Sequence, residues 1–289
     1  MDIATIAIVQ RDKMTEKIKS GSRRVVKSAL PDVQKKEDDR NVKIQKVGVN
    51  NVYIPSFVKT MQGAMQPVTV RLEMAVELPP TQKGAHMSRF VELAHSELMS
   101  SVSMRQLDFV VKQLVNSMKD IRVQDCHISA EFFYMVAGKT PETGKFDMVP
   151  VEVTFEKSLH KTKMKVKTLV QSLCPCSKEI SKYGAHNQRA SVEIEVDCIG
   201  WVWIEDLVAL AREAASAPTY SLLKRPDEKV VTEQAYDNPA FVEDIVRDIT
   251  MDLKHFQEKK VIGKFYVKVT SYESIHPHNA FAEMEVDVK

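Results

Sequence analysis

Residues 68–78 read Val-Thr-Val-Arg-Leu-Glu-Met-Ala-Val-Glu-Leu, and two prolines, Pro79 and Pro80, follow directly. Every even position of this stretch is apolar, whereas Arg71, Glu73 and Glu77 stand at odd positions. Such alternation is typical of a β-strand with one buried and one solvated face, and the two prolines end it. A strand with one solvated face favours an antiparallel sheet, because parallel sheets are normally covered on both faces.

The same period of two returns along the chain and is interrupted by helical spacing. Asn238 and Pro239 have the residue types of an N-cap and a first helical position, so they predict the start of a long helix. In order, strands are expected at 68–78, 126–137, 149–155, 164–170, 192–198, 265–269 and 282–288, and helices at 87–98, 107–118, 207–214 and 238–256. The chain therefore follows the pattern strand-strand-helix-helix-strand-strand twice. This order predicts an α+β fold, an antiparallel sheet with helices on one face.

Composition narrows the class of protein. The 289 residues, 44% of them hydrophobic, can bury one large core or two moderate ones. A net charge of +2 gives no indication of nucleic-acid or membrane-surface binding, and no apolar run approaches the roughly 18 residues of a membrane span. Four cysteines at irregular spacings do not resemble a secreted disulfide framework, so a cytoplasmic location is expected. Residues 1–30 lack a signal-peptide pattern and are expected to form an irregular or poorly ordered arm.

Reactive side chains are concentrated between the strands expected at 164–170 and 192–198. Cys174-Pro-Cys-Ser-Lys-Glu-Ile-Ser is followed by Gly184-Ala-His-Asn-Gln-Arg, a mixture that no hydrophobic core requires. The thiol of Cys174 and the imidazole of His186 are ligand types that suit a catalytic transition metal. A structural zinc site would need two more close Cys or His ligands, and Cys-x-Cys is not the spacing of a redox motif. These residues therefore indicate a functional site.

These motifs resemble the signature of GTP cyclohydrolase type IB, and the resemblance runs from about residue 30 to the C-terminus. Six further stretches carry it: Leu30-Pro-Asp-Val-Gln, Val76-Glu-Leu-Pro, Gly84-Ala-His-Met-Ser-Arg-Phe, Leu223-Lys-Arg-Pro-Asp-Glu-Lys, Asn238-Pro-Ala-Phe-Val-Glu-Asp and Glu273-Ser-Ile-His-Pro-His-Asn-Ala. The resemblance implies two tandem tunnelling-fold units, expected at residues 31–160 and 161–289. It also implies a homo-oligomer, a dimer or tetramer, with active sites at subunit interfaces. We expect Cys174 and Glu243 of one site to come from different subunits.

The implied reaction is the hydrolysis of GTP at C8 with release of formate to give 7,8-dihydroneopterin triphosphate. This is the first step of folate synthesis, and queuosine synthesis is left open as a second pathway. The implied cofactor is a divalent metal, Zn, Mn or Fe, which makes water a nucleophile near neutral pH. By resemblance its ligands are Cys174, His186 and Glu228, although Glu228 alone would read as an exposed loop charge. Cys176 and His86 are expected beside these ligands, and Cys176 is also an alternative thiol ligand.

The resemblance also suggests groups that act on the substrate. His276 and His278 are candidate proton donors, with two structural loop histidines as the competing interpretation, and His86 is a weaker third candidate. Glu243 is expected to read the guanine edge, although it could instead complement a helix dipole. The triphosphate is expected to bind Arg89, Lys178, Arg189 and Arg225. Two other functions remain open: an archaeal-type cyclohydrolase that yields a cyclic phosphate, and a catalytically silent tunnelling-fold scaffold or binding protein.

Overall fold

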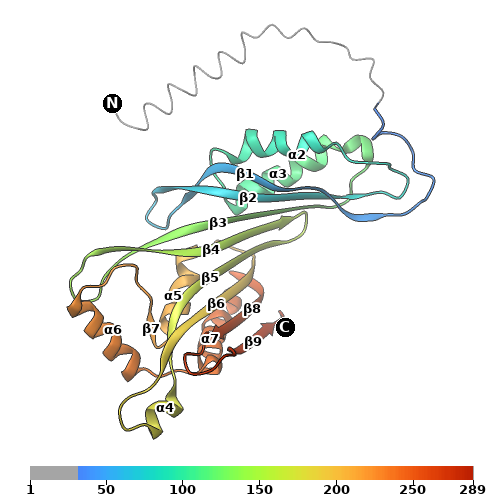
Figure 1. The fold of residues 1–289 in the computed structure, drawn as a ribbon. Coiled ribbons are helices and arrows are strands. Elements are labelled where there is room, and N and C mark those ends of the chain that lie inside the picture. The colour runs from blue at the N-terminus through green and yellow to red at the C-terminus, as the bar shows by residue number, and fades with distance from the viewer. Residues whose placement is uncertain (1–31, 289) are drawn as a thin grey trace, which may run out of the picture. The chain divides into compact units, whose positions relative to one another are not determined.

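The computed structural model describes residues 32–288, so the arm expected at residues 1–30 lies outside the described residues. From Gln34 on, the chain forms one compact unit around an antiparallel sheet, which has nine strands within the described part of the chain. The strand order is β1-β2-β3-β4-β5-β6-β8-β9, and the short strand β7 pairs with β5 (Figure 1). Helices lie on one face of the sheet, so the predicted α+β class is confirmed.

The strands extend beyond most of the expected limits. Their bounds are β1 Ile44–Lys59, β2 Met65–Leu78, β3 Cys126–Lys139, β4 Phe146–Ser158, β5 Thr162–Leu173, β6 Asn187–Cys198, β7 Ala217–Pro218, β8 Ile262–Ser271 and β9 Ala280–Val286. The helices are α2 Met87–Leu93, which continues as the π-helix η1 Ala94–Leu98, then α3 Met104–Ser117, the 3₁₀-helix η2 Lys119–Ile121, α4 Pro175–Ile180, α5 Ile204–Ala214, α6 Arg225–Asp237 and α7 Val242–Glu258.

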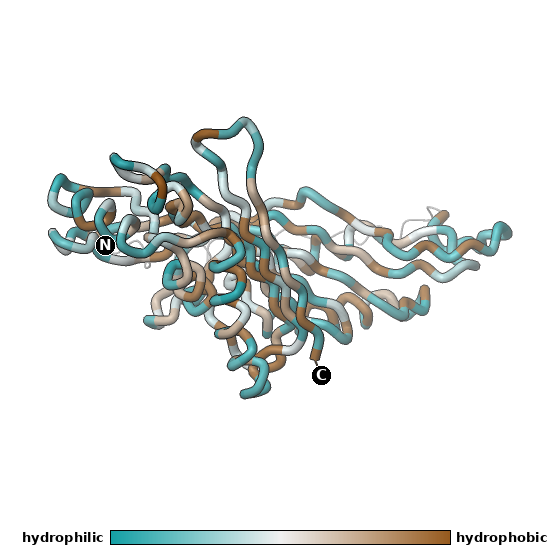
Figure 2. The backbone as a smooth tube through the Cα atoms, turned by 90° about the horizontal axis from the view of Figure 1, so that it is seen from below, coloured by the Kyte–Doolittle hydropathy of each residue, from teal (hydrophilic) through white to brown (hydrophobic). Residues whose placement is uncertain are grey.

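Alternation along β2 separates the two faces of the sheet as the sequence predicts. Val70, Leu72 and Met74 are completely buried on the helix-covered side, whereas Arg71 points outward and pairs with Glu131 of β3. The hydropathy colouring in Figure 2 shows the same alternation of apolar and polar positions along the strands. In the second half, the outer face carries cross-strand pairs, such as Lys165 with Glu193 at 2.6 Å. The solvent-exposed face of the sheet is therefore charged, and the helix-covered face is apolar.

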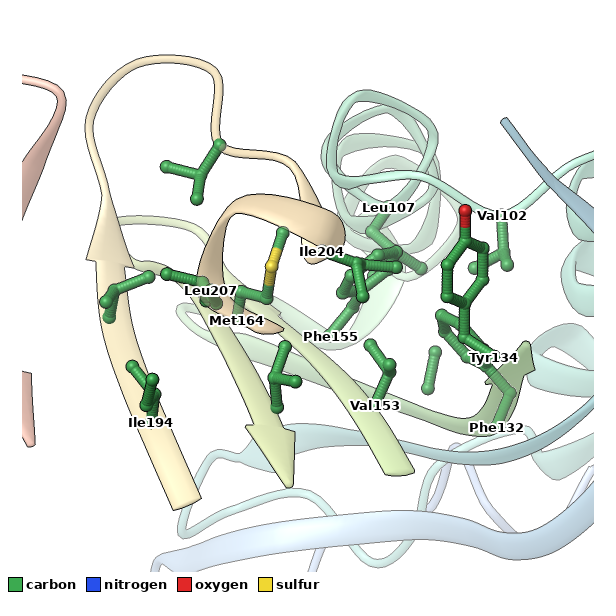
Figure 3. Packing of buried hydrophobic residues seen from close by; sticks show 14 of the residues in the cluster. Val102, Leu107, Phe132, Tyr134, Val153, Phe155, Met164, Ile194, Ile204 and Leu207 are labelled. Carbon is green, nitrogen blue, oxygen red and sulfur yellow. The ribbon is translucent and has the colours of Figure 1, made fainter. Parts of the chain in front are cut away.

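The two expected units share one sheet and one core. The boundary expected near residue 160 falls in the turn between β4 and β5, and these two strands pair directly across it. Phe155 of β4 lies opposite Met164 of β5 and packs edge-on against Phe132 of β3, with ring centroids 5.1 Å apart. Leu107 of α3 and Ile204 of α5 belong to the same buried cluster, drawn in Figure 3. The covered face thus forms a continuous core from one half to the other.

The start of α7 differs from the prediction. Asn238 does not open this helix, because its backbone N–H donates to the carbonyl of Gln234 and so closes α6. The helix begins at Val242, where Asp244 accepts a hydrogen bond from the N–H of Phe241 at 3.1 Å. The sequence pattern also gave no helix for residues 225–237, which form α6.

None of the described helices combines the length and the apolar character that crossing a bilayer would require.

Candidate active site

The end of the β5–β6 hairpin places Cys174 and His186 side by side. The antiparallel ladder ends with Leu173 opposite Asn187, so the next residue of β5 faces the residue before β6. The N–H of Cys174 donates to the carbonyl of His186 at 3.1 Å, which continues the ladder by one step. The eleven residues between Cys174 and His186 therefore fold back as a short hairpin connection that contains α4.

Serine 177 fixes the geometry of this connection. Cys174 is the N-cap residue of α4, and its Sγ accepts a hydrogen bond from the N–H of Ser177 at 3.4 Å. The hydroxyl of Ser177 accepts in turn from the N–H of His186 at 3.1 Å. Pro175 occupies the first turn of the helix, where its missing N–H costs nothing. The Cys-Pro-Cys-Ser sequence thus holds both candidate ligands in one local network.

Two polar side chains lie next to Nδ1 of the His186 ring. Its Nδ1 lies 2.7 Å from Oε1 of Gln188 and 3.9 Å from a carboxylate oxygen of Glu273, in the loop between β8 and β9. Because the Gln188 oxygen can accept a hydrogen bond and the Glu273 carboxylate is negatively charged, both favour the tautomer with the proton on Nδ1, which leaves Nε2 as a lone-pair donor. This arrangement is typical of metal-binding histidines.

A cavity of about 300 Å³ opens beside these two residues. It is lined by Ser172, Cys174, His186, Gln188, Ala240, Phe241, Val242, Glu243, Glu273, His276, His278, Ala280 and Phe281. The expectation that Cys174 and Glu243 of one site come from different subunits stays a prediction, but a single chain already brings both residues to this cavity. The reason is that α7 begins next to the end of β5, where Ser172 donates to the carbonyl of Ala240 at 2.9 Å.

Glu243 is available for a ligand. It is the second residue of α7 and is exposed, while its neighbour Asp244 caps the helix. Among the described residues, no hydrogen bond or ion pair to the carboxylate of Glu243 is present, and Arg247 pairs with Asp244 instead. Asp244 makes the capping bond, while Glu243 in the first turn can still complement the helix dipole, so that alternative stays open. His276 and His278 are exposed and stack with ring centroids 4.8 Å apart, so both rings can meet a ligand in the cavity.

The donor set fits a metal in part. A thiol and an imidazole with a free Nε2 face the same cavity, as a transition metal requires. Glu228 does not line that cavity, since it lies in the first turn of α6. Within residues 32–288, no three Cys, His, Asp or Glu side chains of one chain converge enough to hold a metal ion. One chain thus provides two ligands together and presents the third expected one elsewhere.

None of the four cations expected at the triphosphate lines the cavity. Arg89 donates to Asp120 at 2.9 Å, and this hydrogen bond holds the pKa of the Asp120 carboxyl well below its usual range. Lys178 donates to the carbonyl of Tyr236 at 2.5 Å. Arg189 lines a neighbouring cavity of about 600 Å³, and Arg225 is exposed at the start of α6.

The two residues expected beside the ligands are also apart from the cavity. Cys176 is exposed on α4, and His86 precedes α2 with its Nε2 3.7 Å from Asp120. Conversely, sequence reasoning assigned no role to Gln188 or Glu273, which orient His186. Both lie inside the motifs quoted above, Gln188 beside His186 and Glu273 just before His276. That position in the sequence was the only signal that could have identified them. Their actual contact depends on the fold of the β8–β9 loop.

Comparisons with known proteins show the family of this chain. Residues 30–282 match a family model described as type I GTP cyclohydrolase folE2. A protein named GTP cyclohydrolase FolE2 from Dictyoglomus turgidum is 41% identical over 259 residues, which cover 89% of this chain and 98% of that protein. The protein of the same name from Geobacter sulfurreducens is 39% identical over 261 residues, 89% of this chain and 98% of its own.

Among solved structures, a hyperthermostable R298C mutant of urate oxidase from Bacillus sp. TB-90 superimposes with a TM-score of 0.50. The match covers 84% of this chain and 98% of that one, at 8% sequence identity. Such low identity shows the fold alone, and it confirms the predicted tunnelling fold.

Proposed function

Because the chain belongs to the family of type I GTP cyclohydrolases named FolE2, we propose that the cavity beside Cys174 and His186 is where it opens the purine ring of GTP. The enzyme is a type IB GTP cyclohydrolase I, a hydrolase of folate biosynthesis. The observation that carries the location is that one cavity presents a thiol, an oriented imidazole, a free carboxylate and two further histidines.

The family is metal-dependent, and we propose that Cys174 and His186 bind the divalent metal. When bound there, the metal supplies a water acidic enough to attack C8 near pH 7. The hydrogen bond to Gln188, with the nearby charge of Glu273, keeps the proton of His186 on Nδ1, so that Nε2 is available for the metal. Zn²⁺, Mn²⁺ and Fe²⁺ all accept this mixture of sulfur, nitrogen and oxygen donors.

Glu243 is proposed to bind guanine. The base presents N1–H and the exocyclic amine side by side, and one carboxylate can accept both bonds. Since Asp244 makes the capping bond of α7, the carboxylate of Glu243 keeps its oxygens available for a ligand. Phe241 and Phe281 line the same cavity and offer apolar contact to a flat heterocycle.

Protons are proposed to move through the histidine pair. The purine nitrogen next to C8 must gain a proton as water adds, and imidazole can donate one near neutral pH. His276 and His278 both line the cavity that Glu243 lines, so both rings are candidates to contact a base bound there. The stacked arrangement keeps the two rings together.

Glu228 is proposed to reach the metal from a neighbouring subunit of a homo-oligomer, with a tetramer of two dimers as the expected form. Two observations support this. The third ligand is missing from the cavity of one chain, and the outer strands β1 and β9 leave open sheet edges, which proteins normally cover by pairing. The triphosphate would bind cations at the same interface, with Arg89, Lys178, Arg189 and Arg225 as candidates.

Metal removal and restoration test the proposal. Chelator-treated enzyme should stop releasing formate from GTP, and Mn²⁺, Zn²⁺ or Fe²⁺ should restore dihydroneopterin triphosphate, identified by its mass. Cys174→Ala should stay folded but lose bound metal and turnover. Cys198→Ala is the matched thiol control, because Cys198 lies outside the cavity and burial raises its pKa to about 12. Normal turnover by metal-free Cys174→Ala would refute the proposal.

A further inference from the structure

The first turn of α6 is tied to a distant hairpin by one carboxylate. Asp227 accepts hydrogen bonds from the N–H groups of Glu142 at 3.0 Å and Thr143 at 2.7 Å, and from the hydroxyl of Thr143 at 2.7 Å. It also accepts from the N–H of Lys224 at 3.0 Å, the residue before the helix. Figure 1 shows α6 beginning beside the turn that joins β3 to β4. The carboxylate therefore joins α6, in the second half, to a hairpin of the first.

Helix capping alone does not explain this arrangement. Three helices begin with an aspartate that accepts the N–H of the N-cap residue: Asp206 in α5, Asp227 in α6 and Asp244 in α7. Asp206 and Asp244 are partly exposed and make no bond to another hairpin within the described residues, whereas Asp227 is completely buried. Burial of a carboxylate is unfavourable unless hydrogen bonds replace its water, and Asp227 has four.

The rest of α6 is weakly attached by apolar contacts. Its other buried residues are Val231 and Ala235, which belong to a small cluster with Leu173 and Ala217. With so little apolar area, the position of the first turn depends on the polar bonds to the hairpin. Glu228 is the next residue, and its N–H donates to the carbonyl of Lys224 at 2.8 Å within the same turn. A shift of that turn would move Glu228 with it.

We propose that Asp227 is a positioning residue, which fixes the first turn of α6 against residues 140–145 and thereby sets the place of Glu228 at the metal. The inference rests on the proposed role of Glu228 as a metal ligand. Asp227 faces the protein and Glu228 faces outward, as adjacent residues of a helix do, so Asp227 does not touch the metal or the substrate. Asp227 affects the reaction only because it sets the position of the α6 backbone that carries Glu228.

Asp227→Asn tests this in the full-length enzyme, because the amide keeps the size but replaces one acceptor by a donor. We expect Mn²⁺ to bind about 10- to 100-fold more weakly, the usual cost of losing a group that orients a ligand. Hydrogen exchange at Glu142, Thr143 and Lys224 should become faster, while circular dichroism and subunit number stay as in wild type. Thr143→Val, which removes only the hydroxyl, should show a smaller loss in the same direction.

Asp206→Asn is the matched control, since it removes the same capping bond from α5 without a hairpin contact. Its Mn²⁺ affinity should stay within about twofold of wild type, because it keeps every contact of α6. Wild-type affinity in Asp227→Asn with faster exchange in the hairpin would overturn the proposal, as would an equal loss in Asp206→Asn. Glu228→Gln separates the ligand role of Glu228 from the positioning role of Asp227. If it binds Mn²⁺ as wild type does, the ligand role fails; if only Glu228→Gln loses metal, the ligand role stands and the positioning role fails.

Discussion

The end of the β5–β6 hairpin and the first turn of α6 both carry proposed metal ligands, but they are built in opposite ways. Cys174 and His186 are held by a strand ladder and by residues within twelve positions of each other. Glu228 is placed by a carboxylate neighbour that bonds to a hairpin more than eighty residues earlier. The positions of Cys174 and His186 should therefore not change when distant contacts are lost. The position of Glu228 should change.

Mixed oligomers give the largest effect that separates the two regions. Cys174→Ala and Glu228→Gln should each be inactive alone. If a site combines Cys174 of one subunit with Glu228 of another, random mixing restores about a quarter of the wild-type sites. Co-expression with two different tags, followed by purification on both, allows turnover to be measured in such mixtures.

A mixture of Cys174→Ala with His186→Ala is the control. These two residues line the cavity of one chain, so no arrangement of subunits brings an intact pair together. Recovery in this control would mean that chains exchange the hairpin. Continued inactivity of the first mixture would show that Glu228 does not act across an interface.

Glu243→Ala should lower kcat/KM for GTP by about tenfold to more than a hundredfold, since it removes a charge-assisted contact to the base. Metal content should not change, because Glu243 lies on α7 and not on the hairpin or α6. Asp248→Ala, exposed on the same helix, is the control and should keep wild-type kinetics. Wild-type kcat/KM in Glu243→Ala would exclude recognition of guanine by this residue.

Sequence patterns predicted the local region better than the distant one, for a physical reason. Alternation reports which face of a strand is buried, so β2 and β3 were located closely, whereas the first five residues of β6 were missed. It missed β1, where register shifts between Ile44 and Val47 and between Val49 and Val52 break the period. It missed α6 because the buried residues of that helix are few and include Asp227, which a hydrophobic pattern counts as surface.

The candidate site divides in the same way. The proximity of Cys174 and His186 follows from a hairpin between two alternating strands, and the family motifs added Glu243 and the histidine pair. Nothing in the spacing could show that Glu273 would reach His186 across the β8–β9 loop. Nor could the spacing show that Arg89 donates a hydrogen bond to Asp120, because that contact depends on the packing of α2 against the chain after α3.

Gln188→Leu tests how far the hairpin orients its own ligand. The change removes the oxygen that lies 2.7 Å from Nδ1 of His186, and Glu273 remains nearby at 3.9 Å. Because the charge of Glu273 still favours a proton on Nδ1, we expect a loss of metal affinity of about tenfold, the lower end for such contacts. Gln171→Leu on β5, outside the cavity, should bind Mn²⁺ normally. Equal affinity in both variants would show that Gln188 does not orient the ring.

Lys178 links the two regions, and its substitution should have the smallest effect. Its ammonium donates to the carbonyl of Tyr236 near the end of α6 and lies 4.5 Å from the centre of the Tyr236 ring. A triphosphate-binding role predicts that Lys178→Met raises KM for GTP by tenfold or more, as loss of a charged hydrogen bond of roughly 1.5–3 kcal/mol would do. The structural contact predicts instead a fall of about 1 kcal/mol in the free energy of unfolding, with KM changed less than about twofold.

We expect the structural outcome for Lys178→Met, measured by denaturant unfolding together with steady-state kinetics. Lys182→Met is the matched control, because Lys182 is exposed just after α4 and contacts only the neighbouring Tyr183 ring among the described aromatic residues. It should change neither quantity. A tenfold rise in KM confined to Lys178→Met would show that Lys178 binds the triphosphate of GTP. It would also mean that the α4–α6 contact opens when GTP binds, since one ammonium cannot keep its place on Tyr236 while it moves to a phosphate.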